Sequence, residues 1–352
     1  VLKYGGQVVK FAGDSLIAIF PADKEHGEAH LGSALQCALH MQQIMSHFAE
    51  VETTAGNYPL QMKIGIGEGS LYNTTVGEEN RGMQPVLAGL PLARCMEAEN
   101  VAEAGEIVVD AAVVNRTPGR LDIGESRGTF RLIAGAQDVP VLPSTVFPDI
   151  FGLSALRTSQ IFQRLSPYLP AQLVERIRQG QRGGYGEHRR ITVVFVKFGG
   201  LNYDWDPDVG SVLQVYFKTM QDCISRYGGR LNEVDIISDG GTLVAFFGAP
   251  TAHEDDEQRA ISCAWEMQQV VAEVRLAAGE AADRLCQCIG ISSGMVFVGD
   301  VGAPVRRVYA AVGDEVNLAS RLMGVAEWGE VITTGWVQKR TAVRFEFEAM
   351  GQ

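Results

Sequence analysis

The chain has 352 residues, of which 46% are hydrophobic, and it carries a formal net charge of −12. Two domains are expected, since a single core rarely grows beyond about 250 residues. The acidic balance argues against a nucleic-acid partner, because phosphate binding draws on clustered Lys and Arg. No apolar run reaches the roughly 20 residues that span a bilayer, and the first residues do not have the pattern of a signal peptide. We therefore expect a cytoplasmic chain without a transmembrane segment.

The cysteines and histidines give no sign of a metal site. The six cysteines lie mostly in apolar runs and never form Cys-x-x-Cys, a pattern typical of reduced thiols in a core. His26 and His30 have helical spacing, but the Glu between them is in the wrong place for a zincin. We expect neither structural nor catalytic zinc.

The first predicted element is a β-hairpin over residues 5–20. Two aliphatic runs flank the corner Gly13-Asp14, which presents one carboxylate at the tip, and Lys10 lies on the strand before it. Taken singly, an Asp in such a corner usually serves the turn, and a strand Lys is usually solvated. The hairpin alone therefore does not identify a site.

An amphipathic helix over about 31–48 is predicted next, followed by a strand pair beginning near 62–67, a turn at Gly89 that leads into a helix, and a short strand at 106–109. Glycines at 65, 67 and 69 lack the spacing of a dinucleotide-binding loop. A close approach of backbone explains them better.

The same order of features recurs about 220 residues later along the chain, which indicates an internal repeat. The second copy also has an opening strand at 190–196, for which the first copy has no counterpart. Strands and helices in this order predict an α+β fold, an antiparallel sheet with helices covering one face.

The repeat gives a domain prediction. We expect a first domain at 1–135 that lacks its opening strand, a linker at 136–186, and a second domain at 187–352 that lacks its C-terminal strands. The linker is proline-rich, with one short helix at 170–179 that ends at Gly180. We expect the chain to be an internal piece of a longer protein with further domains.

Two motifs in the repeat resemble those of the class III nucleotidyl cyclases. The first is Lys-Phe-Ala-Gly-Asp at 10–14, and the second is Gly-Asp-Glu-Val-Asn-Leu-Ala-Ser-Arg at 313–321. The tandem arrangement is similar to the paired catalytic halves of the soluble adenylyl cyclases and their bacterial relatives. The resemblance implies two ferredoxin-like halves that pair with each other as a pseudo-two-fold heterodimer and act on ATP.

The resemblance also implies roles for individual residues. In this family the ribose 3′-hydroxyl of ATP attacks the α-phosphorus, which forms 3′,5′-cyclic AMP and pyrophosphate with two Mg²⁺ or Mn²⁺ ions held by two aspartates. Asp14 matches one metal ligand. Arg321 matches the arginine that stabilises the α-phosphate in the transition state, and Asn317 matches the residue that orients the ribose. Lys10 would contact adenine, and Ala310 stands in the base pocket where adenylyl cyclases typically have Asp or Thr.

The two copies differ in a complementary way. Each lacks the functional residues that the other has, so we expect one competent site, with Lys10 and Asp14 on one side and Asn317 and Arg321 on the other. The symmetry-related twin would be degenerate, with Lys197 in the place of a metal-binding aspartate. The matched pairs are Asp14 and Gly241, Lys10 and Ile237, Asn317 and Ala93, and Arg321 and Glu97.

Two functions remain open. The leading one is adenylyl cyclase activity in the full-length protein. We expect this chain alone to be inactive or nearly so, because one carboxylate rarely holds two magnesium ions. The alternative is a non-catalytic cyclase-like module that binds a nucleotide or transmits a signal. Guanylyl cyclase activity is disfavoured, since such family members have Glu at the position of Lys10.

Overall fold

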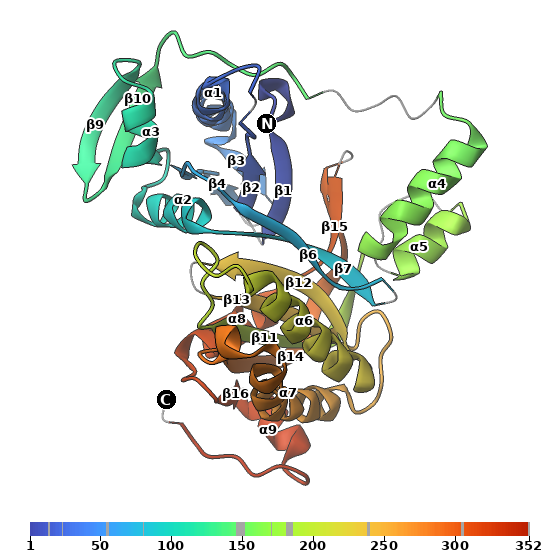
Figure 1. The fold of residues 1–352 in the computed structure, drawn as a ribbon. Helices are drawn as coiled ribbons and strands as arrows, with labels where there is room; N and C mark the ends of the chain where they lie inside the picture. The colour runs from blue at the N-terminus through green and yellow to red at the C-terminus, as the bar shows by residue number, and fades with distance from the viewer. Residues whose placement is uncertain are drawn as a thin grey trace. The chain divides into compact units, whose positions relative to one another are not determined.

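The structure is a computed structural model of the chain. It describes residues 1–12, 15–22, 24–53, 56–79, 81–145, 152–169, 171–180, 186–237, 240–303 and 306–350. The chain folds into two compact units (Figure 1). The first unit contains Val1–Leu71 and Gly89–Gly152, and the second contains Tyr72–Ala88 and Leu153–Gln352. A hairpin from the first half of the sequence therefore lies in the second unit.

The second unit is built on a mixed sheet in the order β12-β13-β11-β14-β15, with β16 parallel to β14. The central strand β11 is antiparallel to both β13 and β14. From Ile191 to Phe198 it is an almost continuous run of β-branched and aromatic residues, as expected for a strand that is covered on both faces. The strands are β11 Gly186–Gly199, β12 Arg230–Ile237, β13 Gly240–Phe247, β14 Cys286–Ala303, β15 Arg306–Val312 and β16 Val331–Thr333.

Helices cover both faces of this sheet. Val194 and Val196 of β11 join the core under α6 (Val209–Arg226) and α7 (Asp256–Ala278). Val193 belongs to a separate core under α8 (Asp314–Val325). The prediction of helices on one face only was wrong, because a strand without polar alternation must be covered twice. A short helix, α9 (Gly335–Thr341), and a 3₁₀ turn, Glu280–Ala282, complete this part of the unit.

The first unit contains a four-stranded sheet in the order β5-β8-β10-β9 and two separate hairpins, β1-β2 and β3-β4. Its core lies between α1 and the sheet, where Leu35 and Ala38 contact Ile66, Ile107 and Val109. Its strands and helices are β1 Gln7–Ala12, β2 Ser15–Ile19, β3 Val51–Thr53, β4 Gly56–Tyr58, β5 Ile64–Ile66, β8 Ile107–Asp110, β9 Leu121–Arg127, β10 Phe130–Ala136, α1 Ala29–Met45, α2 Leu90–Val101 and α3 Ala111–Arg116, with 3₁₀ turns at Leu2–Tyr4 and Ser46–Phe48.

The internal repeat is confirmed by equivalent packing in the two units. In the first, β5 pairs in parallel with β8, and in the second, β14 pairs in parallel with β16. A Cβ at Gly65 would collide with the carbonyl oxygen of Cys95 on α2, and one at Gly290 would collide with that of Ala319 on α8. The glycines that could suggest a nucleotide loop therefore let a helix backbone lie directly on a strand.

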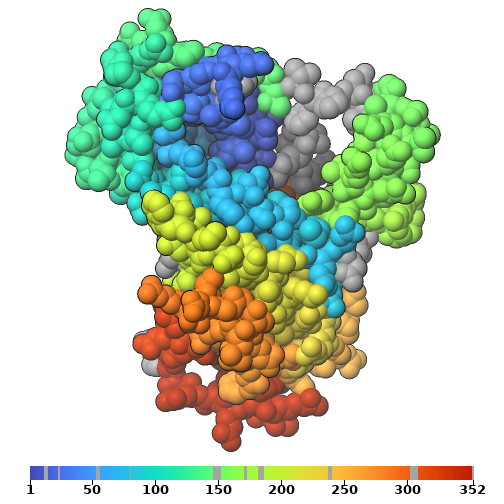
Figure 2. Space-filling view, viewed as in Figure 1, coloured from blue at the N-terminus to red at the C-terminus, as the bar shows by residue number. Residues whose placement is uncertain are grey.

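The hairpin of β6 (Tyr72–Glu78) and β7 (Gly82–Ala88) packs along α6 in the second unit (Figures 1 and 2). Gln221 of α6 is 2% exposed, and its side chain donates to the carbonyl of Gly82 at 2.7 Å and accepts from the N–H of Glu78 at 3.2 Å. Gln214 bonds both backbone groups of Gly77 at 3.0 Å. Two glutamines thus hold the hairpin through its backbone.

Replacing Gln221 with Leu is expected to destabilise the second unit by about 2 kcal/mol, because a buried N–H and a carbonyl lose their partners. Urea denaturation measures the loss. Lys218→Gln is the matched control on the same helix: it removes the exposed ion pair with Glu78, and a smaller loss is expected. Equal losses of stability in the two variants would contradict the role of Gln221 in holding the β6-β7 hairpin.

The segment expected to be a linker, 136–186, contains two described helices, α4 (Ala155–Leu165) and α5 (Ala171–Arg178), with a 3₁₀ turn at Ser166–Tyr168 between them. The second is the helix expected at 170–179, whereas α4 was not predicted. Its signal is Ser154, whose hydroxyl accepts from the N–H of Arg157 at 3.3 Å as an N-cap. Within the described ranges, the helices are each too short or too polar to cross a membrane.

The six cysteines are free thiols. Burial raises the pKa of the Cys223 thiol to about 12, with a further contribution from the nearby Glu266 carboxylate, and burial also raises the pKa of Cys263 well above 9.0. We expect iodoacetamide to modify both slowly at pH 9 in the folded protein and fast in urea, as mass spectrometry can measure. The thiols lose their protons at a lower pH in the unfolded chain than in the folded one, so the free energy of unfolding should fall as the pH rises from about 9 to 12. Fast labelling of the folded chain would contradict the burial.

Candidate functional site

Helix α8 carries two of the predicted site residues. Its inner side is fixed to the sheet: Ala319 is fully buried, and Glu315 accepts a hydrogen bond from the hydroxyl of the buried Ser292. Asn317 and Arg321 lie on its outer side, where both are exposed. The prediction that these two side chains share one helical face is confirmed, since residues four apart are neighbours on a helix.

The contacts that hold α8 against the sheet were not predicted from the sequence. Gly290 lets the backbone of α8 approach β14. On the helix, Glu315 accepts a hydrogen bond from Ser292, and the next residue, Val316, packs against the core. Together these contacts fix the rotation of the helix about its axis. A fixed rotation is what keeps Asn317 and Arg321 on the outer side.

Ala310, the expected base-pocket residue, is half-buried on β15, opposite Gly299 of β14. Next to it, Tyr309 stacks under the guanidinium of Arg230, whose carbon lies 5.0 Å from the ring centroid. Burial lowers the pKa of Arg230 and raises that of Tyr309. No sequence motif indicated this pair, because the two residues are far apart along the chain.

Lys10 lies on β1, opposite Ile17 of β2 and just after a register shift, and it is half-buried. Asp14 lies outside the described residues. Lys10 belongs to the first unit, while Asn317 and Arg321 belong to the second. A common site formed by these residues therefore stays a prediction.

The hairpin register corrects one matched pair. In both copies a register shift follows the second residue of the first strand, after Val8 and after Leu231. Lys10 then pairs with Ile17, and Glu233 pairs with Val244. Glu233, rather than Ile237, therefore stands where Lys10 stands. The second hairpin extends further beyond this point, so counting residues back from its turn gave the wrong partner.

Lys197 lies on β11 between Thr242 and Cys288, and its ammonium is 5.1 Å from the ring centroid of Trp328. A cation at this position disfavours a divalent metal ion, since like charges repel. In the described ranges, no three or more His, Cys, Asp or Glu side chains gather as metal ligands. The described residues thus do not by themselves fit the two ions that the family resemblance implies.

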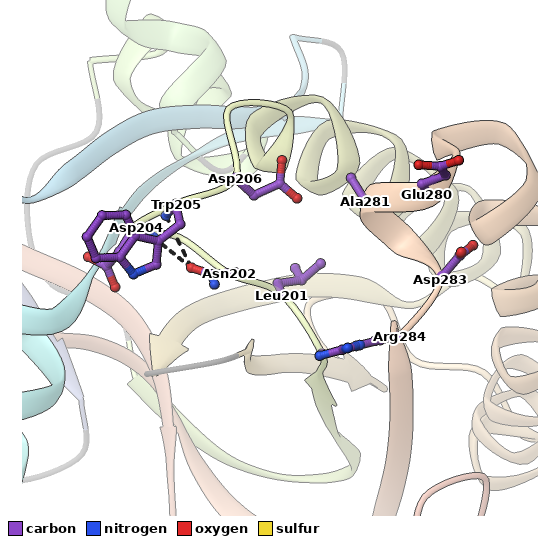
Figure 3. A pocket seen from close by; sticks show the side chains of 10 residues that line it. Leu201, Asn202, Asp204, Trp205, Asp206, Glu280, Ala281, Asp283 and Arg284 are labelled. Carbon is purple, nitrogen blue, oxygen red and sulfur yellow. Dashed lines mark hydrogen bonds between the residues drawn. The ribbon is translucent and has the colours of Figure 1, made fainter.

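A cavity of about 710 Å³ opens where the chain leaves β11 (Figure 3). Trp205 and Asp204 line one end, and Glu280 and Asp283 the other, with Arg284 below them. Asn202 shapes the loop, because its side-chain oxygen accepts from two backbone N–H groups at 3.2 Å. The cavity has four carboxylates, from Asp204, Asp206, Glu280 and Asp283, and one guanidinium, from Arg284. This excess of negative charge would repel a polyphosphate, so this end of the sheet in the second unit does not suit the phosphates of a nucleotide. The lining residues are Gly200, Leu201, Asn202, Asp204, Trp205, Asp206, Glu280, Ala281, Asp283 and Arg284.

Comparison with known proteins finds similarity to cyclases. Residues 185–352 match the sequence model of the adenylate and guanylate cyclase catalytic domain. Adenylate cyclase type 10 of Homo sapiens is 22% identical over 92% of this chain, and the match spans 21% of that protein. Adenylate cyclase 1 of Rhizobium meliloti is 30% identical over 52% of the chain and 28% of its own length. The crystal structure of the adenylyl cyclase CyaB from P. aeruginosa has a TM-score of 0.42 and 26% identity, and covers 46% of this chain and 84% of that one.

Residues 185–352 thus belong to the adenylate and guanylate cyclase catalytic domain family. Along 92% of its length the chain is similar to adenylate cyclase type 10 of Homo sapiens and Mus musculus, and it spans about a fifth of the length of these relatives.

Proposed function

We propose that this chain is part of the catalytic region of an adenylyl cyclase, which converts ATP to 3′,5′-cyclic AMP and pyrophosphate. One observation carries the proposal: Asn317 and Arg321 are exposed together on the outer face of a helix whose inner face is fixed to the sheet. The similarity to adenylate cyclase type 10 over 92% of the chain supports it.

Arg321 is proposed as the donor to the α-phosphate. Negative charge develops on the phosphate oxygens as the ribose 3′-oxygen attacks and pyrophosphate leaves. A guanidinium offers two parallel N–H donors and keeps its charge at every working pH. Asn317, one helical turn earlier, would hydrogen-bond the ribose and hold the 3′-hydroxyl in line with the phosphorus.

The base is assigned to Lys10 and the neighbourhood of Ala310. The Lys10 ammonium would donate to a ring nitrogen of adenine. Ala310 supplies neither donor nor acceptor from its side chain, so discrimination against guanine would be weaker by about 1 kcal/mol than with a hydrogen-bonding residue.

Mg²⁺ or Mn²⁺ would bind beside Asp14 and supply charge neutralisation at the phosphates. The family uses two aspartates for two ions, and Asp14 alone in this chain matches that pattern. The second unit is proposed to contribute α8 but no metal ligand, since Lys197 takes the aspartate position and the adjoining cavity is acidic.

The copy of α8 in the first unit is proposed to be inactive. On α2, the equivalents of Asn317 and Arg321 are Ala93, which is buried, and Glu97, whose carboxylate would repel a phosphate. One catalytic site for the pair of halves follows.

The alternative, a non-catalytic module, is favoured by Lys197 and by the acidic cavity, which both oppose a metal–phosphate complex in the second unit. The two proposals are separated by initial rates with ATP and with GTP at equal concentrations, in the presence of Mg²⁺ or Mn²⁺, on the full-length protein. We expect cyclic AMP to form faster than cyclic GMP. Nucleotide binding without either product would establish the alternative.

A further inference from the structure

One half-buried arginine of the second unit faces an aromatic ring rather than a carboxylate. Arg230 begins β12, and its guanidinium carbon lies 5.0 Å from the ring centroid of Tyr309 on β15. These two strands are the ends of the order β12-β13-β11-β14-β15, so the contact joins opposite ends of the sheet. A cation and an aromatic face attract each other more strongly when both are shielded from water.

The other charged groups around this ring are paired among themselves. Glu187 accepts a hydrogen bond from Arg189 at 2.9 Å. Asp300, which stands opposite the tyrosine in the strand register, forms an ion pair with Arg176 at 3.8 Å. Within the described ranges, no carboxylate forms an ion pair with Arg230, so the ring is what its guanidinium contacts. Burial without an acidic partner also lowers the pKa of Arg230.

Tyr309 belongs to the core that carries α8. Together with Ala311 it packs against a cluster that includes Phe246 of β13 and Ala319 of α8. Side chains two apart on a strand point to the same face, so Ala310, between these two residues, points to the opposite face. The inner face of β15 therefore rests on the core, and the outer face presents Ala310.

Backbone pairing holds β15 on one side only. In the described part of the chain it pairs with β14 and with no other strand. Arg230 stands opposite Phe246 in the register of β12 and β13, which places its side chain at the border of the core that Tyr309 enters. The contact between the guanidinium and the ring thus supplies a second attachment for β15.

We propose that Arg230 is a positioning residue for the nucleotide base. It holds β15 through the ring of Tyr309, and β15 presents Ala310 to the base on its other face. This inference rests on the proposed function, which assigns the neighbourhood of Ala310 to adenine. It adds a residue from the opposite end of the sheet that acts through β15 rather than on the nucleotide.

The test begins with Arg230→Met in the full-length protein, which keeps the apolar stem and removes the cation. Contacts to the base are made equally in the bound substrate and in the transition state. The KM for ATP should therefore rise at least about fivefold, while kcat stays within about twofold of wild type. Arg230→Lys should recover part of the loss, because an ammonium is also attracted to an aromatic face.

Two variants of the ring make the result specific. Tyr309→Phe keeps the aromatic face and should behave as wild type. Tyr309→Leu removes it and should raise KM as Arg230→Met does. Because the two residues act as one contact, Arg230→Met combined with Tyr309→Leu should raise KM no further than either change alone. Additive effects would contradict an action through the ring.

Hydrogen exchange by mass spectrometry tests the attachment without turnover. The amides of 308–312 should exchange at least about fivefold faster in Arg230→Met, while those of 191–198 in β11 should exchange as in wild type. Unchanged exchange at 308–312, or an unchanged KM despite faster exchange, would overturn the proposal. A wild-type protein that forms no cyclic AMP would overturn the proposed function instead. Equilibrium dialysis with ATP then replaces KM, and equal affinity of wild type and Arg230→Met, or no binding at all, would overturn this proposal too.

Discussion

Replacing Arg321 with Ala should lower the rate of cyclic AMP formation in the full-length protein by at least about a hundredfold, the effect of losing one transition-state donor. The guanidinium is exposed on α8 and has no packing role in the sheet below, so the fold should be unaffected. The loss should appear in kcat rather than KM, because the charge that Arg321 meets develops during the reaction.

Two further variants make this result specific. Asn317→Ala should cost a similar factor, since the ribose loses its orientation while the charge on α8 is kept. Arg321→Lys should recover only part of the rate, because an ammonium lacks the two parallel donors. Unchanged kinetics in either alanine variant, with an intact fold by circular dichroism, would remove α8 from the site.

Replacing Gly290 with Val should destabilise the second unit by about 3 kcal/mol, the upper range for forced overpacking. The new side chain would meet the carbonyl oxygen of Ala319 and the backbone nitrogen of Met323, neither of which can move without displacing α8. Urea denaturation measures the change. The rate of cyclic AMP formation by the full-length protein should also fall, because α8 is displaced.

The control for this variant lies on α8 itself. Gly324 has open space around it, so Gly324→Ala should be neutral or stabilising by up to about 1 kcal/mol, the helix propensity difference between the two residues. If Gly290→Val were as stable as the wild type, α8 would not rest directly on β14, and the fixed outer face of Asn317 and Arg321 would lose its basis.

The features that the sequence predicted well are local ones. The strands and helices and the shared face of Asn317 and Arg321 follow from periodicities within a few residues, and the repeat follows from the recurrence of these local patterns along the chain. Other features depend on contacts between distant segments. The attachment of β6-β7 to α6 rests on Gln221, which lies 139 residues after Gly82. No local pattern marks such a contact.

Two errors have a common physical origin. The match of Lys10 with Ile237 failed because the second hairpin extends further beyond the register shift that both copies share, so that Lys10 corresponds to Glu233. The expectation of helices on one face failed because the apolar run of β11 has no polar alternation and needs cover on both faces, the second from α8. In both cases the backbone pairing, rather than residue type, decides the outcome.

The most direct test of the account compares equivalent helix positions in the two copies. Arg321→Ala on α8 and Glu97→Ala on α2 remove one exposed charge each from corresponding sites. In the full-length protein, initial rates of cyclic AMP formation from ATP should fall by at least about a hundredfold in the first variant and stay within about twofold of wild type in the second. Equal effects of the two substitutions, or no effect of the first, would contradict a single catalytic site that depends on α8.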